Sequence, residues 1–201
     1  ALPLPPARVH IASGPPAEAI LRQVRASGAD LVVMGPHRED AGGPPGRLGG
    51  TAEALLARLD TPVMIVTRGE VLDGPGFARI LAAVDFSPAC GAALAWAAGL
   101  PGDPAPELHL FHLLPVPPFP KYSRAAYAAD TAAARRRLAD FGRRYAGERP
   151  LALEVEGGGL PGPAILRRAA ELPADLVVLG THTRDRRGKW YAGSVMREVA
   201  A

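Results

Sequence analysis

Two short segments near the end of the chain have the residue types of a phosphate-binding loop. Gly180-Thr181-His182-Thr183 follows an apolar run, and Gly193-Ser194 comes after nine further residues. Glycine lets backbone N–H groups approach an anion closely, and the N-terminus of a helix attracts the same charge through its unpaired donors and its dipole. The Ser194 hydroxyl adds a donor, and Arg184, Arg186, Arg187 and Lys189 add positive charge. The pattern therefore predicts a phosphate site at this loop.

Asp85 is a second candidate for contact with a ligand. It follows the apolar run 80–84 and precedes Phe86-Ser87-Pro88, where Ser87 suits the N-cap of a helix and Pro88 suits its first turn. An aspartate at the end of a strand can also do no more than cap the next helix. Asp85 taken alone leaves both interpretations open.

The elements that must position these residues follow from the hydrophobic pattern. Apolar runs of strand length alternate with amphipathic helical patterns, which is typical of βαβ units and a parallel sheet. We expect strands near residues 80–84, 108–114, 151–155 and 176–179, and helices over 88–98, 161–171 and from 194 onward. A longer helix is expected beyond 120, with one face made of Tyr127, Ala134, Leu138, Phe141 and Tyr145. Its arginines are interpreted as a solvent-exposed face: Arg135, Arg136, Arg137, Arg143 and Arg144.

The chain also contains a long internal repeat. Residues 14–37 align without a gap with residues 159–182 at a constant offset of 145. A repeat of this length indicates a repeated domain. In the first copy we expect strands at 7–11, 31–34 (buried) and 63–66, with helices over 16–26 and after Thr51.

The same offset predicts the domain boundaries. Residues 1–68 are interpreted as the C-terminal half of a first domain, 69–76 as a linker rich in turn formers, and 77–201 as a second domain lacking its last strand. The counterpart of residues 80–85 would fall before residue 1, and that of residues 61–66 after residue 201. We therefore expect a fragment of a longer tandem protein.

Together, the loop, the helix start and Asp85 resemble the universal stress protein family. Its nucleotide-binding members carry Gly, two residues, Gly, nine residues, and then Gly with Ser or Thr. The resemblance extends to Val84-Asp85-Phe86-Ser87-Pro88 and to the apolar strand ahead of Gly180. It implies an α/β fold of the adenine nucleotide alpha hydrolase-like type, with a doubly wound parallel sheet of strand order 3-2-1-4-5 in two tandem copies. Ligands of such sheets bind outside the carboxyl ends of the strands, where the strand order reverses.

The resemblance further implies which residues bind a nucleotide in the second copy. The ligand would be an adenosine nucleotide, with ATP accompanied by Mg²⁺ expected first, and it would act as a regulatory ligand in a stress response. Adenine and ribose would contact Ala83, Val84 and Asp85, with Leu113 beside the ring. The ribose and phosphate side would consist of Leu179, Gly180, His182, Thr183 and Arg184, and the phosphates would be closed in by Gly193, Ser194, Val195 and Met196.

Two departures from the family motif matter for this interpretation. Thr183 stands at the second Gly, and if that position needs a positive φ, a β-branched residue there costs roughly 1–3 kcal/mol. In the first copy, eleven residues separate Gly35-Pro36-His37-Arg38 from Gly50-Thr51, so the loop is two residues longer. The first copy also lacks the opening strand with its aspartate. We expect no complete nucleotide site there.

Other side chains do not combine into a catalytic set. His109 and His112 are three apart on an expected strand and so face opposite sides, and Cys90 is interpreted as a small buried hydrophobe. Any ATP hydrolysis is therefore expected to be slow, with no catalytic residue assigned. Trp190-Tyr191 suit either a partner surface or a lid, and residues 115–120 suit a stiff connection or an extended docking segment.

The alternative function is a nucleotide-free interaction and dimerisation module, free-standing or the cytosolic regulatory part of a transporter. The family resemblance implies pairing through the last strand, here residues 63–66, as a homo-oligomer or an intrachain pseudo-dimer. A formal net charge of +3 over 201 residues argues against nucleic acid as a partner. The single cysteine, and the lack of a signal peptide or an apolar run of about 18 residues, predict a cytoplasmic protein that does not insert into a membrane.

Overall fold

The computed structural model describes residues 7–36, 48–66, 76–115, 123–184, 190–192 and 194–200. The chain divides into two compact units. The first contains Ala1–Val71, Arg184–Ala192 and Ala200–Ala201, and the second contains Leu72–Thr183 and Gly193–Val199. Each unit is described by itself.

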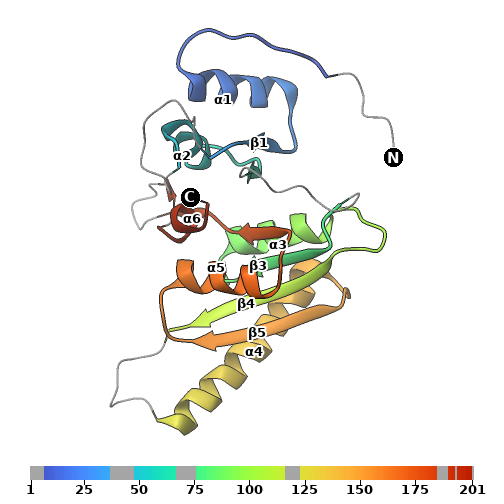
Figure 1. Ribbon diagram of the computed structural model, residues 1–201, viewed down its shortest axis with the longest axis vertical. Coiled ribbons are helices and arrows are strands. Elements are labelled where there is room, and N and C mark those ends of the chain that lie inside the picture. The colour runs from blue at the N-terminus through green and yellow to red at the C-terminus, as the bar shows by residue number, and fades with distance from the viewer. Residues whose placement is uncertain are drawn as a thin grey trace. The chain divides into compact units, whose positions relative to one another are not determined.

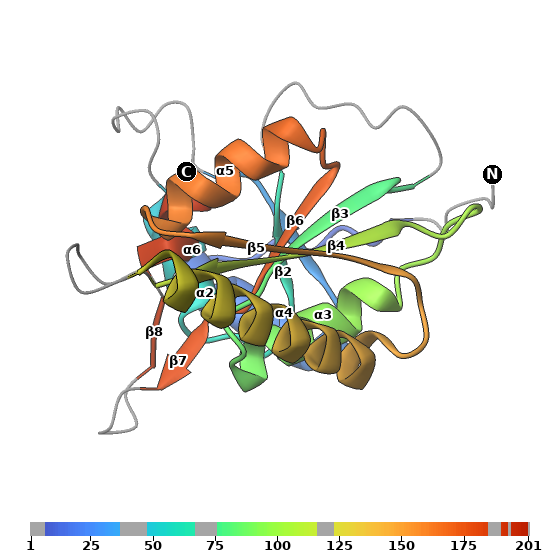
Figure 2. The ribbon, with the colours of Figure 1, turned by 90° about the horizontal axis from the view of Figure 1, so that it is seen from below.

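The second unit is built on a four-stranded parallel sheet. Its strands are β3 (Arg79–Ala83), β4 (Glu107–Leu114), β5 (Leu151–Gly157) and β6 (Leu176–Leu179), in the order β5-β4-β3-β6. Helices α3 (Pro88–Ala98) and α4 (Arg124–Ala146) cover one face, and α5 (Pro161–Glu171) and α6 (Ser194–Val199) cover the other (Figures 1 and 2). In the order of the chain the strands run 3-2-1-4, which confirms the predicted doubly wound α/β fold.

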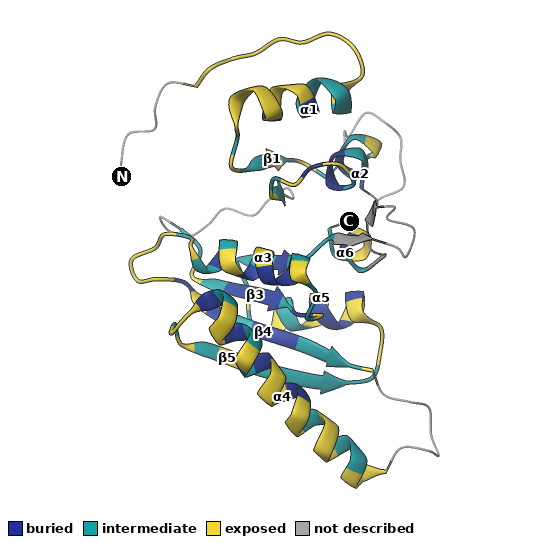
Figure 3. Cartoon of the chain, turned by 180° about the vertical axis from the view of Figure 1, so that it is seen from behind, coloured by how far each residue is buried: buried dark blue, intermediate teal, exposed yellow. Residues whose placement is uncertain are grey.

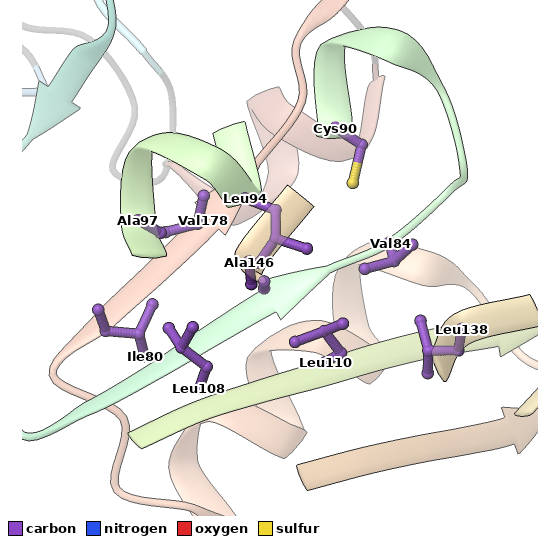
Figure 4. Close-up of a cluster of buried hydrophobic side chains, with 11 residues drawn as sticks. Ile80, Val84, Cys90, Leu94, Ala97, Leu108, Leu110, Leu138, Ala146 and Val178 are labelled. Atoms are coloured by element: carbon purple, nitrogen blue, oxygen red, sulfur yellow. The ribbon is translucent and has the colours of Figure 1, made fainter. Parts of the chain in front are cut away.

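The central strands are buried on both faces, as their continuous apolar runs require. One face of the sheet packs against α3 and α4 through a cluster that includes Ile80, Leu94, Leu110 and Leu138 (Figure 4). The other face packs against α5 and α6 through Leu81, Phe111, Ala164 and Ile165. Side chains alternate along β3, so that successive residues join different clusters.

Local sequence explains where α3 and α4 begin. Ser87 is the N-cap of α3, because its Oγ accepts a hydrogen bond from the Cys90 N–H at 3.1 Å, and Pro88 occupies the first turn as predicted. Ser123 caps α4 in the same way, with the Ala126 N–H at 3.1 Å. Figure 3 shows both buried and exposed positions along α4, and the predicted arginines are all exposed.

The first unit contains α1 (Pro16–Ser27), β1 (Val32–Met34), α2 (Gly50–Leu56) and β2 (Val63–Ile65). The two strands pair in parallel, and Val32 is opposite Val63. Leu21 and Val24 of α1 pack against Leu55 and Leu59. The helices and strands expected between residues 16 and 66 are therefore present.

Two predictions for the first unit are wrong. Residues 7–11 form no strand, and Ile11 is 97% exposed. Their counterpart, β5, is held by β4, and within the described residues no strand pairs with residues 7–11. Val33 of β1 was expected to be buried but is 58% exposed, whereas its counterpart Val178 is 7% exposed in the cluster that includes Leu94 of α3.

A short two-stranded ribbon replaces part of the expected loop after β6. β7 (His182–Arg184) pairs with β8 (Trp190–Ala192). The expected linker residues 69–75, the docking or connecting segment 116–120 and the first-copy loop residues 37–47 lie outside the described residues. No helix in the described part of the chain is long and apolar enough to cross a membrane.

Candidate functional site

The carboxyl ends of β3 and β6 lie side by side where the strand order of the second unit reverses. β3 and β6 are neighbours, and Ala83 is paired with Leu179 in their register. β3 continues into α3 on one face of the sheet, whereas α6, which follows β6 in the chain, packs on the other face. This divergence creates the position at which parallel α/β sheets bind ligands. Asp85 and Gly180 lie just beyond the two carboxyl ends.

Four of the predicted contact residues gather on one face of the sheet. Ala83, Leu113, Leu179 and Val195 are partly buried and belong to the cluster on the α5–α6 face, with Leu81 and Phe111 beneath them. Together they form an apolar surface at the carboxyl edge, which we call the apolar surface below. Such a surface suits one face of a planar aromatic ring.

Val84 lies on the opposite face. Its side chain is buried in the α3–α4 cluster. Its backbone groups are also engaged, because its N–H donates to the Phe111 oxygen at 2.8 Å and its oxygen lies 2.7 Å from Nδ1 of His112. Val84 therefore supports the end of β3 rather than adding to the apolar surface.

Asp85 is exposed and does not cap α3. Its Oδ1 accepts the Ser87 N–H at 2.8 Å, while the Ser87 side chain makes the cap. The carboxylate closes the turn between β3 and α3 and still faces solvent. The cap itself is made by Ser87, and contact of Asp85 with a ligand stays a prediction.

Gly180 packs tightly against the first turn of α3. A Cβ placed on it would come within 2.6 Å of the Cys90 Cα and 2.7 Å of the Ala89 carbonyl carbon, which are backbone atoms that cannot move aside cheaply. Glycine is required here by packing alone. The contact also places the start of the loop after β6 beside the N-terminus of α3.

The remaining loop residues are described in their backbone. His182, Thr183 and Arg184 form β7, and Ser194 is the first residue of α6. Extended backbone suits a β-branched residue, so the strain anticipated for Thr183 in a left-handed conformation does not arise in this ribbon. Met196 is buried, and the predicted contact Gly193 lies outside the described residues.

Sequence reasoning missed three side chains behind Asp85. Phe86 has φ of 63°, which is rare for a residue other than glycine. Its ring contacts the His112 ring at 4.5 Å between centroids, and Cζ of Arg137 lies 4.0 Å from its centroid. These residues come from the β3–α3 turn, from β4 and from α4. The one signal in the sequence was the aromatic residue Phe86 in the short turn between Asp85 and the capping residue Ser87.

Cys90 is a packing residue, as predicted. It is 2% exposed, and its thiol donates to the Ala83 oxygen at 3.3 Å. Burial raises the pKa of the thiol to about 11. His109 and His112 lie three residues apart on β4, so their side chains point to opposite faces of the sheet. Within the described residues, no three His, Cys, Asp or Glu side chains lie close enough together to hold a metal ion.

Comparison with known proteins assigns the pattern to a family. Residues 1–67 and residues 76–201 match the profile of the universal stress protein family in two segments. No curated protein sequence matches the chain. Several solved structures resemble it at low sequence identity.

A universal stress protein from Archaeoglobus fulgidus DSM 4304 is 23% identical, with a TM-score of 0.54; the match covers 79% of this chain and 53% of that one. UspA from Lactobacillus plantarum is 23% identical with a TM-score of 0.46, covering 63% and 92%. A universal stress protein solved in complex with cAMP is 20% identical with a TM-score of 0.40, covering 52% and 76%. The first likeness supports the fold.

Proposed function

Because the chain belongs to the universal stress protein family, we propose that its second unit binds an adenosine nucleotide at the carboxyl edge of the sheet. The observation that carries the proposal is the pairing of Ala83 with Leu179, which brings Asp85 and the Gly180 loop together at the point where the strand order reverses. ATP is the first candidate, and it acts as a regulatory ligand in a stress response.

Adenine packs on the apolar surface. Ala83, Leu113 and Leu179 offer small and aliphatic side chains on one face of the sheet, which is the usual lining of a site for a flat heterocycle. The exposed Asp85 carboxylate lies at the end of β3, next to Ala83 in the chain, where it can accept a hydrogen bond from a ribose hydroxyl.

The phosphates extend toward the loop after β6. Gly180 begins this loop and Ser194 begins α6, so the chain just after Gly180 and the N-terminus of α6 would supply backbone N–H groups. Mg²⁺ enters bound to the phosphates, which is a common way for proteins to hold it.

The nucleotide regulates and is turned over slowly at most. Hydrolysis needs a base that holds a water in line with the phosphate. Among the candidate-site side chains that the structure describes, Asp85 is the one carboxylate, and a Ser87 N–H already holds its Oδ1 at 2.8 Å. Asp85 therefore serves binding in this proposal, and we assign no catalytic residue.

Titration calorimetry of the chain with ATP, ADP and GTP tests this proposal. The wild-type chain should bind ATP, and Asp85→Asn should weaken binding by about tenfold or more, because a hydrogen bond to a charged group contributes roughly 1.5–3 kcal/mol. Asp140→Asn changes an exposed aspartate on α4 and is the matched control, which should bind as the wild type does. GTP should bind more weakly than ATP.

The proposal fails if the wild-type chain binds no adenosine nucleotide, or if Asp85→Asn and Asp140→Asn bind it equally well. Failure of the wild type to bind would favour the alternative, a nucleotide-free interaction module. Such a module could be free-standing or the cytosolic part of a transporter.

We further propose that the chain associates through an open strand edge. β2 pairs with β1 on one side, and its other edge is not paired with any strand in the described part of the chain. Unpaired edges of apolar strands readily add a further strand. Light scattering after gel filtration should show a homo-oligomer. Ile65→Pro, which removes an N–H that faces away from β1, should release it into monomers, and an unchanged oligomer would contradict this edge.

A further inference from the structure

We infer that Phe86, His112 and Arg137 are positioning residues that hold the β3–α3 turn in the conformation that presents Asp85 to the nucleotide. We call these three residues the brace. The inference rests on the proposed function, and it explains how a single exposed carboxylate keeps one orientation.

The turn contains an unfavourable backbone conformation. Phe86 has φ of 63°, in the left-handed region where a Cβ crowds the backbone. Left-handed residues other than glycine persist only where the surrounding structure compensates for them. The contacts of the Phe86 side chain therefore have to keep the turn in place.

Those contacts surround the ring. His112 of β4 packs against it at 4.5 Å, Phe141 of α4 meets it edge to face at 5.6 Å, and the Arg137 guanidinium carbon lies 4.0 Å from its centroid. Edge-to-face aromatic pairs and a guanidinium over a ring are both attractive. Arg137 thus differs from its neighbours in the arginine run, because its guanidinium packs on an aromatic ring of the turn.

His112 also fixes the residue before Asp85. Its Nδ1 lies 2.7 Å from the Val84 oxygen, and because a carbonyl oxygen can only accept, Nδ1 carries the proton and donates. The Val84 N–H is held by the Phe111 oxygen at 2.8 Å. On the other side of Asp85, the strained Phe86 leads to Ser87, whose N–H holds the Asp85 carboxylate at 2.8 Å.

The brace acts from behind the site. Phe86 and Val84 pack with the cluster on the α3–α4 face, whereas the apolar surface lies on the α5–α6 face. The brace residues therefore do not touch the adenine in the proposed pose. They pre-organise Asp85, and binding is strongest when the contact group is already held in its bound geometry.

Two kinds of measurement on the full chain test the inference. The first is the ATP dissociation constant of Phe86→Ala, Phe86→Tyr and Arg137→Gln, each measured well below the melting temperature of that variant. Phe86→Ala should weaken binding by about tenfold, because small displacements of a contact group have effects of that size or more. Phe86→Tyr keeps the ring and should restore binding, and Arg137→Gln should weaken it while Arg136→Gln, one residue away on α4, should not.

The second measurement compares Phe86→Gly with Phe86→Ala in thermal unfolding. Both variants lose the ring, but glycine adopts a φ of 63° without a steric penalty. Phe86→Gly should therefore melt at a higher temperature than Phe86→Ala. The reverse order would overturn the left-handed turn on which the brace depends.

The outcomes separate this inference from the proposed function. If the wild-type chain binds ATP and Phe86→Ala and Arg137→Gln bind it equally well despite lower melting temperatures, the brace is merely structural and the inference fails alone. If the wild-type chain binds no adenosine nucleotide, the proposed function fails and the positioning role fails with it. Weakened binding of Phe86→Ala and Arg137→Gln, together with weakened binding of Asp85→Asn and unchanged binding of Arg136→Gln, supports both.

Discussion

The backbone of Gly180 at the end of β6 lies against the backbone of Cys90 in the first turn of α3, with no room for a Cβ between them. The contact joins the two elements that flank the candidate site, because α3 begins just after Asp85 and the candidate loop begins at Gly180. Its counterpart in the first copy, Gly35, has open space around it. Gly35 can therefore serve as the control position for substitutions of Gly180.

Gly180→Ala should be strongly destabilising and Gly35→Ala should not. The added methyl group on Gly180 would fall within 2.6 Å of the Cys90 Cα, and forced overpacking typically costs about 1–3 kcal/mol. Gly35→Ala meets nothing within 4 Å. Urea denaturation of the two variants checks this, and equal effects would contradict the close packing of β6 on α3.

Asp175 and Asp30 form a second matched pair at the offset of 145. The Asp175 carboxylate accepts the Ala78 and Arg79 N–H groups, both at 2.7 Å, and so secures the start of β3. Asp175→Ala should cost about 2–3 kcal/mol, because hydrogen bonds to a charged acceptor are strong and two donors lose their partner. Asp30→Ala should stay within about 0.5 kcal/mol, as surface changes usually do, because Asp30 is exposed.

The unfolding free energies of these two variants can be compared directly with that of the wild type. A small effect of Asp175→Ala, similar to that of Asp30→Ala, would contradict the role of Asp175 in tying β6 to β3.

Cys90 gives a pH dependence with a defined sign. Burial raises the pKa of its thiol from 9.0 to about 11 in the folded chain. A raised pKa adds stability below pH 9 that is lost as the pH rises toward 11, because the unfolded thiol ionises first. The loss should reach about 2–3 kcal/mol by pH 11, since one pKa unit corresponds to about 1.4 kcal/mol.

Urea denaturation between pH 8 and pH 11 measures this effect, with Cys90→Ala as the reference for all other titrating groups. The wild type should lose more stability than Cys90→Ala across this range. Parallel profiles for the two proteins would show that the thiol is not buried as described.

The sequence predicted those elements whose own residues determine them. Helix α5 and strand β6 begin and end at the predicted residues, and Ser87 caps α3 as its position before Pro88 indicated. The resemblance grouped Ala83 and Val84 as contacts, but successive strand residues face opposite sides, and Val84 is buried on the α3–α4 face. Predictions failed where the structure depends on a neighbouring strand or helix and not on the local sequence. Residues 7–11 form no strand, and the Val33 side chain is exposed whereas that of Val178 is buried.

The brace could not be predicted from local sequence. Phe86, His112 and Arg137 lie on three separate elements, and their contacts arise only when α4 packs over the carboxyl ends of β3 and β4. The charge pattern alone made Arg137 equivalent to Arg136. A left-handed φ at a phenylalanine likewise has no signature in the sequence.

A crystal structure of the chain grown with saturating ATP tests the central claim most directly. The account predicts adenine on the apolar surface of Ala83, Leu113 and Leu179, with the ribose at the Asp85 carboxylate and the phosphates directed along the loop from Gly180 to Ser194. Nucleotide density elsewhere on the chain, or an empty carboxyl edge at saturating ATP, would contradict it.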